Sequence, residues 1–419
     1  MKSNKREIVT FGCRLNQYES EIIRKNAEEV NLQNTTIINT CAVTNSAVRQ
    51  SRQKIRNIKK NFPNKKIIVT GCAAQIDPDS FSNMKEVDFV IGNEEKLNRN
   101  TLKKIVEEIN TKKTLVNDIM SVKTNAPHLI DFFEDRARAF VQIQNGCDHR
   151  CTFCVIPYGR GNARSVDEST IIKQINLLTN AGYREIVLTG VDITSYGIDL
   201  PNKSSLGKIV KKILKECTQL KRLCLSSIDF IELDEDLIET FSDNKILPYL
   251  HLSIQSGDNI ILKRMKRRHL REDIINFCKK IREIRKDIIL GADIIAGFPT
   301  ETDLMFENTM DIINKCNITL LHVFPYSPKK GTPAALMPQV SSKKIKIRAE
   351  KIRAIGEKKL KEYLERQVGS TKEVLIEKGN LGRTENYNKI YLEKGFPTKS
   401  IIKAKVMSVN QNSLIGISI

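Results

Sequence analysis

The chain has 419 residues, 40% of them hydrophobic and 28% charged, a balance that excludes a disordered protein and favours a soluble globular enzyme. Its length predicts two or three domains, and its apolar runs are too short to span a bilayer. The formal net charge of +20 favours a polyanionic partner such as RNA or DNA, although a solvated basic surface would also account for it.

The first segment, MKSNK, leads into a strand-like run without the apolar core of a signal peptide. We therefore expect a cytoplasmic protein that does not associate with membranes. In that reducing compartment, clustered cysteines indicate metal or redox chemistry more often than disulfides.

Residues 1–111 repeat one pattern three times: an apolar strand-like run, a cysteine, and a polar segment that suits a helix, such as Asn45–Asn61. The cysteines are Cys13, Cys41 and Cys72. The pattern predicts βαβ units of a parallel sheet, so all three cysteines would leave the carboxyl ends of strands. Because open α/β sheets bind ligands at this edge, the three thiols could meet at one point.

Residues 112–136 lose this pattern, hold Asn125-Ala-Pro127 and are predicted to be a linker. Strands and helices alternate again over residues 137–367. The predicted strands are residues 140–144, 185–189, 222–226, 249–254, 288–295 and 318–324. The predicted helices are residues 167–180, 206–216, 271–285, 302–315 and the long charged segment 341–367. Six βα units predict a partial parallel barrel with its chemistry at the carboxyl ends of the strands.

Residues 368–419 change to short β-like pieces at 373–377, 389–392 and 401–409, with turns between them. Such a segment suits a small antiparallel barrel of the oligonucleotide-binding (OB-like) type, which often binds nucleic acid. The predicted fold class is therefore α/β, with a parallel-sheet domain, a partial (βα)6 barrel and a small terminal β-barrel.

The stretch GCDHRCTFCVIP (residues 146–157) places Cys147, Cys151 and Cys154 at the end of the first barrel strand. A structural zinc site usually offers four ligands, and no partner pair lies nearby. Three thiolates suit a 4Fe-4S cluster with one iron left open for a small molecule. Cysteines kept only for packing are the other interpretation. His149 is either a further ligand or an ordinary loop histidine.

This cysteine loop resembles the signature of radical S-adenosylmethionine (radical SAM) enzymes, and the chain as a whole is similar to the methylthiotransferases. The motifs that carry the similarity are GCRLNQYES (12–20), NTCAVT (39–44), TGCAAQ (70–75), CTFCVIPYGRG (151–161), LTGVDITSYG (188–197), LSIQSGD (252–258), ADIIAGFPTET (292–302) and HVFPYSPKKGTPA (322–334). GRTENY (382–387) resembles their RNA-binding TRAM domain.

The resemblance implies that Cys147, Cys151 and Cys154 hold one 4Fe-4S cluster, whose open iron binds SAM. It assigns Cys13, Cys41 and Cys72 to a second 4Fe-4S cluster, although buried thiols without metal are the alternative. One SAM molecule would methylate a sulfur species on this auxiliary cluster, and another would provide the radical that activates a C–H bond.

The same resemblance implies a set of residues that contact SAM: Phe153, Thr189, Gly190, Ser253, Gln255, Asp293, Gly297, Phe324 and Tyr326. Alternatively, the glycines only form turns and Ser253 and Gln255 only line the barrel. Superfamily members often have a Gly-Gly-Glu-like motif after the second strand. Here the segment reads Thr189-Gly-Val-Asp192, which leaves the role of Asp192 open.

Methylthiotransferases modify a hypermodified adenosine at position 37 of tRNA, beside the anticodon, or an aspartate of a ribosomal protein. GCRLNQYES is closer to the subgroup that acts on threonylcarbamoyladenosine than to the isopentenyladenosine subgroup. The resemblance thus implies a monomeric tRNA methylthiotransferase that needs an electron donor and a sulfur source of unspecified identity. A non-catalytic iron-sulfur protein that binds RNA is the alternative.

Three further features have two interpretations each. The run 263–268 either contributes to an RNA surface or is a solvated helix face, and Arg160 and Arg164 either meet a phosphate or carboxylate or pair with nearby acids. Tyr387 either stacks on a base or belongs to a core. Cys217, Cys224, Cys278 and Cys316 fall within predicted helices or strands and are interpreted as packing thiols.

Overall fold

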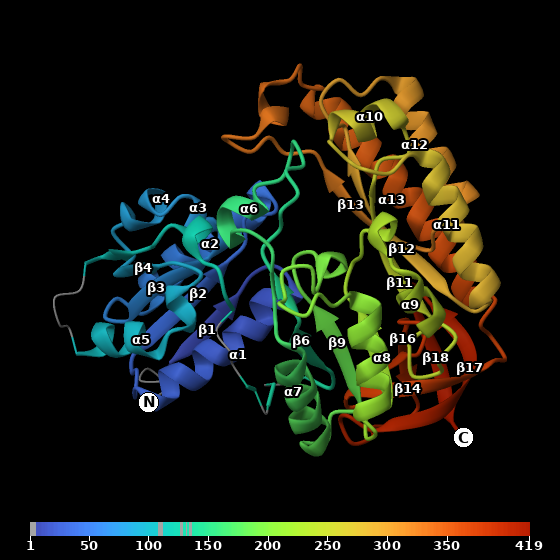
Figure 1. Cartoon of the computed structure of the whole chain (residues 1–419), viewed down its shortest axis with the longest axis horizontal. Coiled ribbons are helices and arrows are strands. Elements are labelled where there is room, and N and C mark those ends of the chain that lie inside the picture. The colour runs from blue at the N-terminus through green and yellow to red at the C-terminus, as the bar shows by residue number, and fades with distance from the viewer. Residues whose placement is uncertain (1–5, 108–111, 126–128, 131, 134–135) are drawn as a thin grey trace.

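The computed structural model describes residues 6–107, 112–125, 129–130, 132–133 and 136–419. Three units follow one another along the chain, from the N-terminal sheet through a central barrel to a small C-terminal barrel (Figure 1). The predicted MKSNK start and Ala126-Pro127 of the predicted linker lie outside the described residues. Within the described ranges, the helices lack the combination of length and apolarity that a membrane crossing requires.

The N-terminal unit is a five-stranded parallel sheet in the order β1-β2-β3-β4-β5. Its strands are β1 Glu7–Thr10, β2 Thr35–Thr40, β3 Lys66–Gly71, β4 Phe89–Ile91 and β5 Thr114–Leu115. The helices of this unit are α1 Arg14–Glu29, α2 Asn45–Asn61, α3 Cys72–Ile76, α4 Asp79–Ser82 and α5 Arg99–Val106. The central strands β2 and β3 are buried because helices cover both faces of the sheet.

The fifth strand corrects the predicted linker. Thr114 and Leu115 pair in parallel with Val90 and Ile91 of β4, so the sheet extends beyond residue 111. A strand of two residues is too short to show any periodicity in sequence, and only its pairing partner identifies it.

The central unit contains the six predicted parallel strands. They are β6 Ala139–Gln142, β9 Glu185–Thr189, β10 Arg222–Leu225, β11 Tyr249–Gln255, β12 Ile289–Ala296 and β13 Leu320–Pro325. Two three-stranded sheets, β10-β9-β6 and β11-β12-β13, are joined by isolated bridges from Leu223 to Ile246 and from Ile228 to Leu252. The partial parallel barrel is therefore confirmed.

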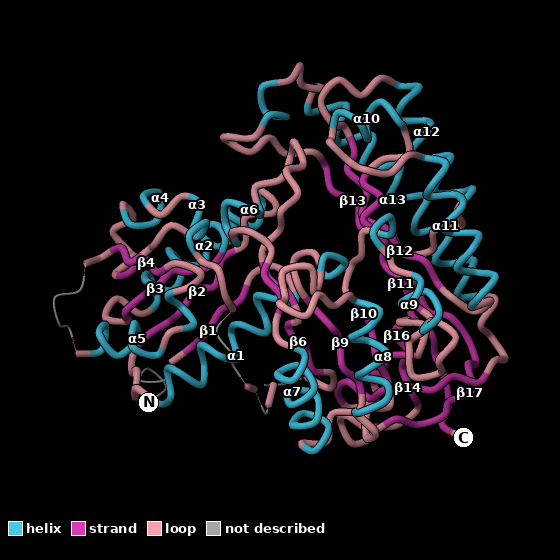
Figure 2. The backbone as a smooth tube through the Cα atoms, viewed as in Figure 1, coloured by secondary structure: helices cyan, strands magenta, loops and turns pink. Residues whose placement is uncertain are grey.

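The helices of this unit are α6 Ile156–Arg160, α7 Glu168–Asn180, α8 Leu206–Glu216, α9 Glu235–Thr240, α10 Asn259–Arg264, α11 Arg271–Ile284, α12 Asp303–Lys315 and α13 Ser342–Glu365. Most of them lie outside the strands, whereas the short α6 lies beside α3 of the N-terminal unit (Figure 2). Polar residues cap the starts of several of these helices: Asp167 accepts from Ser169 N, and Ser205 accepts from Lys208 N. Short strands β7 Gln144–Asn145 and β8 Arg164–Ser165 flank the cysteine loop.

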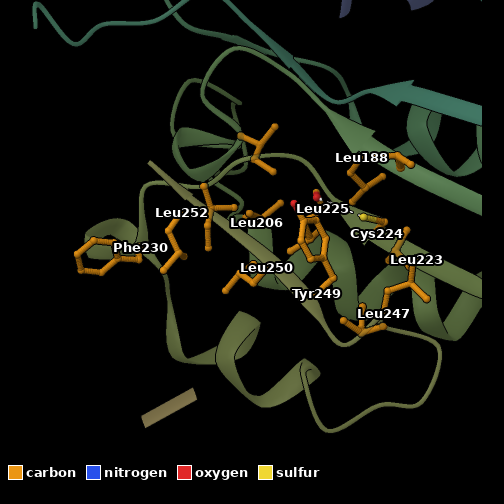
Figure 3. Packing of buried hydrophobic residues seen from close by; sticks show 14 of the residues in the cluster. Leu188, Leu206, Leu223, Cys224, Leu225, Phe230, Leu247, Tyr249, Leu250 and Leu252 are labelled. Carbon is orange, nitrogen blue, oxygen red and sulfur yellow. Dashed lines mark hydrogen bonds between the residues drawn. The ribbon is translucent and has the colours of Figure 1, made fainter. Parts of the chain in front are cut away.

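The core of the barrel is a continuous apolar cluster between strands and helices. Figure 3 shows part of it, with Cys224 among Leu188, Leu223 and Leu225. Cys217, Cys278 and Cys316 are also buried in this cluster, which confirms all four as packing thiols. Tyr18 of α1 joins the same cluster, so the N-terminal unit packs directly on the barrel.

The C-terminal unit is a closed five-stranded barrel in the order β14-β15-β16-β18-β17. Its strands are β14 Thr371–Lys378, β15 Leu381–Thr384, β16 Lys389–Leu392, β17 Ile401–Asn410 and β18 Ser413–Ser418. The small barrel is confirmed, but the prediction that it is wholly antiparallel is wrong, because β16 and β18 pair in parallel. Strand β17 comes between β16 and β18 in the chain, yet these two strands are direct neighbours in the barrel. Chain order alone does not reveal such a pairing.

Candidate iron-sulfur and cofactor site

Cys13, Cys41 and Cys72, here called the N-terminal trio, lie at the carboxyl ends of β1, β2 and β3, as predicted. Cys41 and Cys72 are buried, whereas Cys13 keeps accessible surface. Burial, together with the nearby Cys72 and Cys13, raises the pKa of the Cys41 thiol to about 11. The sheet edge therefore gathers three cysteines that are 28 and 31 residues apart in sequence.

Glycines shape both cysteine sites. Gly12, Gly71 and Gly146 immediately precede Cys13, Cys72 and Cys147 and have φ of 99°, 95° and 73°. This left-handed backbone suits glycine and turns the chain sharply as it leaves each strand. A Cβ on Gly12 would also lie 2.9 Å from Cys41 Sγ. The Gly-Cys pairs in the motifs were a signal of this geometry that the sequence interpretation did not use.

Cys147, Cys151 and Cys154, here called the barrel trio, lie in the loop after β6 and β7. The loop is held in place by backbone contacts to a distant segment, since Thr152 N donates to Met265 O at 3.1 Å. Burial, together with the neighbouring Cys151, raises the pKa of Cys154 to about 11. Cys72 of the N-terminal trio also acts on Cys154, so the two trios are within electrostatic range of each other.

His149 and Asp192 form an ion pair beside the barrel trio. His149 Nε2 lies 2.9 Å from Asp192 Oδ2 and 3.4 Å from Glu232 Oε2. These two acceptors raise the pKa of His149 to about 10. These contacts explain the position of His149 without a metal and favour the interpretation as a loop histidine. Its ligand atom nevertheless lies within 4.8 Å of those of Cys147 and Asp192. Asp192, whose role the sequence left open, thus orients the cysteine loop.

Two arginines of the basic run 263–268 support the loop from within the protein. Arg267 donates to Asp229 at 2.9 Å and to the Ser253 carbonyl at 2.8 Å, and its guanidinium lies 3.8 Å from Cys151 Sγ. Arg268 also pairs with Asp229 at 2.9 Å. Arg267 and Arg268 therefore have acidic partners within the protein. Lys263 and Lys266 of the same run are exposed, and both interpretations, an RNA surface or a solvated helix face, stay open for them.

Arg160 joins the two units through a buried contact. Its side chain is 2% exposed, and Nε lies 3.1 Å from Cys72 Sγ while NH2 lies 2.9 Å from Glu19 Oε2. Lys96 Nζ lies 2.6 Å from the same carboxylate. Burial would raise the pKa of Glu19, but Arg160 and Lys96 outweigh it and lower the pKa. Arg160 therefore pairs with an acid, although one 141 residues away in sequence.

The guanidinium of Arg164 also has hydrogen-bond partners within the protein. Its guanidinium donates to the carbonyls of Asn162 at 2.8 Å and of Arg160 at 3.0 Å. Its hydrogen bonds go to backbone oxygens rather than to a nearby acid.

A cavity of about 200 Å³ lies beside both trios, because its lining includes residues that adjoin Cys41, Cys151 and Cys154 in sequence. Five of the nine residues predicted to contact SAM line it: Phe153, Gln255, Asp293, Phe324 and Tyr326. The opposite wall contains Val43 and Thr44, which directly follow Cys41, and Lys329 from the loop after β13. The sequence interpretation missed these three, although both motifs that contain them were part of the family resemblance.

The other four predicted contacts lie outside this lining. Thr189 is buried at the end of β9, Gly190 follows it, and Ser253 is part of β11. Gly297 has a φ of 75°, and a Cβ there would lie 2.6 Å from Ile345 Cγ1 of α13. The left-handed backbone and the close approach of α13 both favour glycine at position 297. These observations agree with the alternative in which the glycine only forms a turn.

Two histidines that the sequence interpretation did not use flank Asp293 in the barrel. His251 Nε2 lies 3.0 Å from Asp293 Oδ1, and His322 Nδ1 lies 3.3 Å from the same oxygen. Burial would raise the pKa of Asp293, but the two hydrogen bonds outweigh it and hold that pKa well below its usual range. Asp293 is therefore an ionised acceptor in the cavity wall.

Tyr387 packs inside the molecule, as the core interpretation predicts. Its ring stacks on Tyr249 at 4.7 Å with an interplanar angle of 6°. The guanidinium groups of Arg14, Arg138 and Arg383 lie over the same ring at 5.6, 4.9 and 5.0 Å. Tyr387 thus connects the C-terminal unit to the start of β11 and to α1.

The donor sets fit iron-sulfur clusters better than zinc. Each trio offers three soft sulfur atoms, and among the described residues the other four cysteines are buried in the barrel core away from both. Three thiolates hold a 4Fe-4S cluster and leave one iron open. Arg160 at Cys72 and Arg267 at Cys151 supply positive charge beside ligand sulfurs, which stabilises thiolates.

Family models match two segments of the chain. The model of the radical SAM superfamily matches residues 141–313, and that of the uncharacterized protein family UPF0004 matches residues 5–92. Among solved structures, the radical S-adenosylmethionine methyltransferase TsrM from Kitasatospora setae superposes with a TM-score of 0.57 at 13% identity, over 79% of this chain and 75% of its own. This likeness supports the fold alone.

Curated relatives match over almost the whole length. The threonylcarbamoyladenosine tRNA methylthiotransferase MtaB of Rickettsia prowazekii is 52% identical over 98% of this chain and 97% of its own, and that of Aquifex aeolicus is 36% identical over 90% and 94%. A tRNA-2-methylthio-N(6)-dimethylallyladenosine synthase of Ehrlichia ruminantium reaches 31% over 98% and 97%. Two cysteine trios on a shared cavity, a radical SAM domain and these matches lead to one conclusion: the chain belongs to the MtaB family of threonylcarbamoyladenosine tRNA methylthiotransferases.

Proposed function

We propose that this protein adds a methylthio group to carbon 2 of N6-threonylcarbamoyladenosine at position 37 of tRNA, using SAM and two 4Fe-4S clusters. The observation that carries the proposal is the cavity beside both trios. Val43 and Thr44 in its wall follow Cys41, and Phe153 in its wall lies between Cys151 and Cys154. A substrate in this cavity is within reach of both cysteine sites.

Each trio holds one cluster in this proposal. Cys147, Cys151 and Cys154 bind the cluster that receives SAM, and the N-terminal trio binds the auxiliary cluster. When bound, these groups supply the one-electron reductive cleavage of SAM and the sulfur that is transferred. The nine residues predicted to contact SAM remain candidates, with the five that line the cavity supported by their position.

The chain's own side chains position and shield this chemistry. Asp293, fixed by His251 and His322, offers an ionised acceptor to hydroxyl or amino groups of a ligand. Phe153, Phe298 and Tyr326 form edge-to-face contacts beside the barrel trio, which provides an apolar wall that excludes water.

Three domains divide the work in the proposal. Residues 1–111 together with β5 carry the auxiliary site, residues 137–367 form the radical SAM barrel, and residues 368–419 form the RNA-binding TRAM domain. The partner is tRNA, which fits the net charge of +20. We further propose a cytoplasmic monomer that receives electrons and sulfur from separate partners; gel filtration of the reconstituted protein tests the monomer.

The proposal is tested with protein reconstituted anaerobically with iron and sulfide, then mixed with SAM, a reductant and tRNA that carries threonylcarbamoyladenosine. We expect 5′-deoxyadenosine and methylthio-threonylcarbamoyladenosine in digests analysed by mass spectrometry. A protein that binds iron and tRNA but yields no 5′-deoxyadenosine would instead be a non-catalytic RNA-binding protein. Product only on isopentenyladenosine tRNA, or only on a ribosomal protein, would move the chain to a sister subgroup.

A further inference from the structure

Charge is sparse and uneven in the cavity beside both trios. Among its lining residues only Asp293 and Lys329 carry charge. Asp293 is already engaged by two histidines. Lys329 is therefore the cation that the cavity offers to a ligand.

Within the described part of the chain, Lys329 has no acidic partner. Its Nζ donates to Asn45 Oδ1 at 2.9 Å, a neutral acceptor at the first residue of α2. Burial in the cavity wall lowers the pKa of Lys329, although Cys41 opposes that shift. A partly desolvated ammonium without a counter-charge gains stability from any anion that enters.

Lys329 lies at the side of the cavity near the N-terminal trio, where the sulfur to be transferred is proposed to be held. Its Nζ donates to Asn45, four residues after Cys41, and it shares the cavity lining with Val43 and Thr44. Its loop also contacts α2 through Asn45 Nδ2 and the Pro328 carbonyl, at 3.5 Å. An anion bound by Lys329 would thus lie beside the N-terminal trio, where the auxiliary cluster is proposed.

We propose that Lys329 binds the carboxylate of the threonylcarbamoyl group and so selects this adenosine over its isopentenyl counterpart. The inference rests on the proposed function and names a residue that determines substrate choice within it. The threonylcarbamoyl group ends in a carboxylate, whereas an isopentenyl group is uncharged and apolar. An ammonium that faces hydrocarbon would lose hydration without an ion pair, so the same residue attracts one substrate and disfavours the other.

The carboxylate of SAM is the competing ligand for Lys329. SAM is expected at the open iron of the barrel trio, whereas Lys329 donates to Asn45, in the segment that follows Cys41 of the N-terminal trio. This placement favours the substrate carboxylate, and the two ligands can be separated by experiment.

The test compares Lys329→Gln with Lys330→Gln in the full-length, reconstituted protein. Glutamine keeps a hydrogen-bonding side chain at 329 but removes its charge, and Lys330 is an exposed neighbour that does not line the cavity. The substrates are one tRNA with threonylcarbamoyladenosine at position 37 and the same tRNA with that carboxylate converted to its methyl ester. The readouts are kcat/KM for methylthio transfer, Kd for SAM and iron content.

We expect the wild type and Lys330→Gln to prefer the acid over the ester, and Lys329→Gln to lose that preference. The kcat/KM of Lys329→Gln for the acid should fall about 10- to 100-fold, the range for one lost charged contact, while its SAM affinity and iron content stay unchanged. Lys329→Arg should retain the preference for the acid because it keeps the charge.

Other outcomes would overturn the proposal. Equal loss on acid and ester with weaker SAM binding would assign Lys329 to SAM, and an unchanged acid preference would remove it from recognition altogether. If Lys329→Gln binds little iron, its kcat/KM is not interpretable, and Lys329→Arg is used instead. Loss of the acid preference in Lys329→Arg at normal iron content would contradict the proposal. Failure of the proposed function is distinguishable, because the wild type itself would then not modify the acid.

Discussion

The two cysteine trios reach similar donor sets by different routes. The barrel trio lies within eight consecutive residues, from 147 to 154, and its loop is supported by Arg267 and Asp192 of the same unit. The N-terminal trio spans residues 13 to 72 and depends on the register of three parallel strands. It is also completed by Arg160, which comes from the barrel unit. One site is local, and the other needs correct packing of two units.

The largest expected effect separates the chemical roles of the two trios. We expect replacement of Cys147, Cys151 and Cys154 by alanine to abolish 5′-deoxyadenosine formation and to reduce bound iron from about eight to about four atoms per chain. Replacement of Cys13, Cys41 and Cys72 should halve iron as well but leave 5′-deoxyadenosine formation in place without methylthio product. Iron analysis and product chromatography measure both, and normal iron in the second variant would contradict the auxiliary site.

The next prediction tests whether iron binding by the N-terminal trio depends on its contact with the barrel unit. Arg160→Gln leaves Glu19 and Lys96 buried without their third charge, which should cost about 3–5 kcal/mol of stability. Iron bound by the N-terminal trio should fall while the barrel trio retains its own. The signals are resolved by electron paramagnetic resonance of the reduced protein.

The control for Arg160→Gln is Arg99→Gln. This change breaks the exposed ion pair between Arg99 and Glu29, which both belong to the N-terminal unit. Such a surface pair contributes about 0–1 kcal/mol, so stability and iron content should hardly change. Equal iron loss at both cysteine sites in Arg160→Gln would argue for global unfolding rather than a specific link.

A smaller effect is expected where the barrel contacts the C-terminal unit, away from both trios. Tyr387→Ala removes the stack on Tyr249 and the ring beneath three arginines, and should cost about 2–4 kcal/mol. Iron content should remain normal at both sites. Denaturant unfolding gives the stability, with Tyr391→Ala on an exposed ring as the control. Lost iron in Tyr387→Ala would show that docking of this unit supports the cysteine sites.

The smallest effect concerns tRNA affinity at the N-terminal unit. Helix α2 starts at the cavity wall, has no acidic residue, and presents Arg49 and Arg56 on a shared groove. The double change Arg49→Gln and Arg56→Gln should lower the slope of log affinity against log salt by about 1–2, because each lysine or arginine that contacts a phosphate releases one counterion. Filter binding across salt concentrations measures this slope.

The matched control for α2 removes two positive charges from α13, Lys358 and Lys361, which are 79% and 69% exposed. We expect its salt slope to stay near that of the wild type. Equal slopes in the two double variants would mean that net charge, rather than α2, attracts the RNA.

Local patterns predicted most of the regular structure. The helix over residues 45–61 was predicted with the bounds that the structure has, because Thr44 caps its start and Pro63 follows its end. The two-residue strand β5 was missed because it has no period, and the parallel β16–β18 pair was missed because chain order does not give strand order. Lys329 was missed as a site residue because only folding places its loop beside Asn45.

The sequence by itself determined the chemistry that this protein can perform. Three cysteines in one short loop, and three more after strand-like runs, already specify soft sulfur donors in two sets, since residue type and local spacing carry that information. Only the tertiary structure decided which partners those thiols have. Arg160 meets Cys72 and Glu19, and Lys329 meets Asn45, across separations of 88, 141 and 284 residues. Such contacts arise from the packing of whole units, which burial of apolar surface drives and local pattern does not encode.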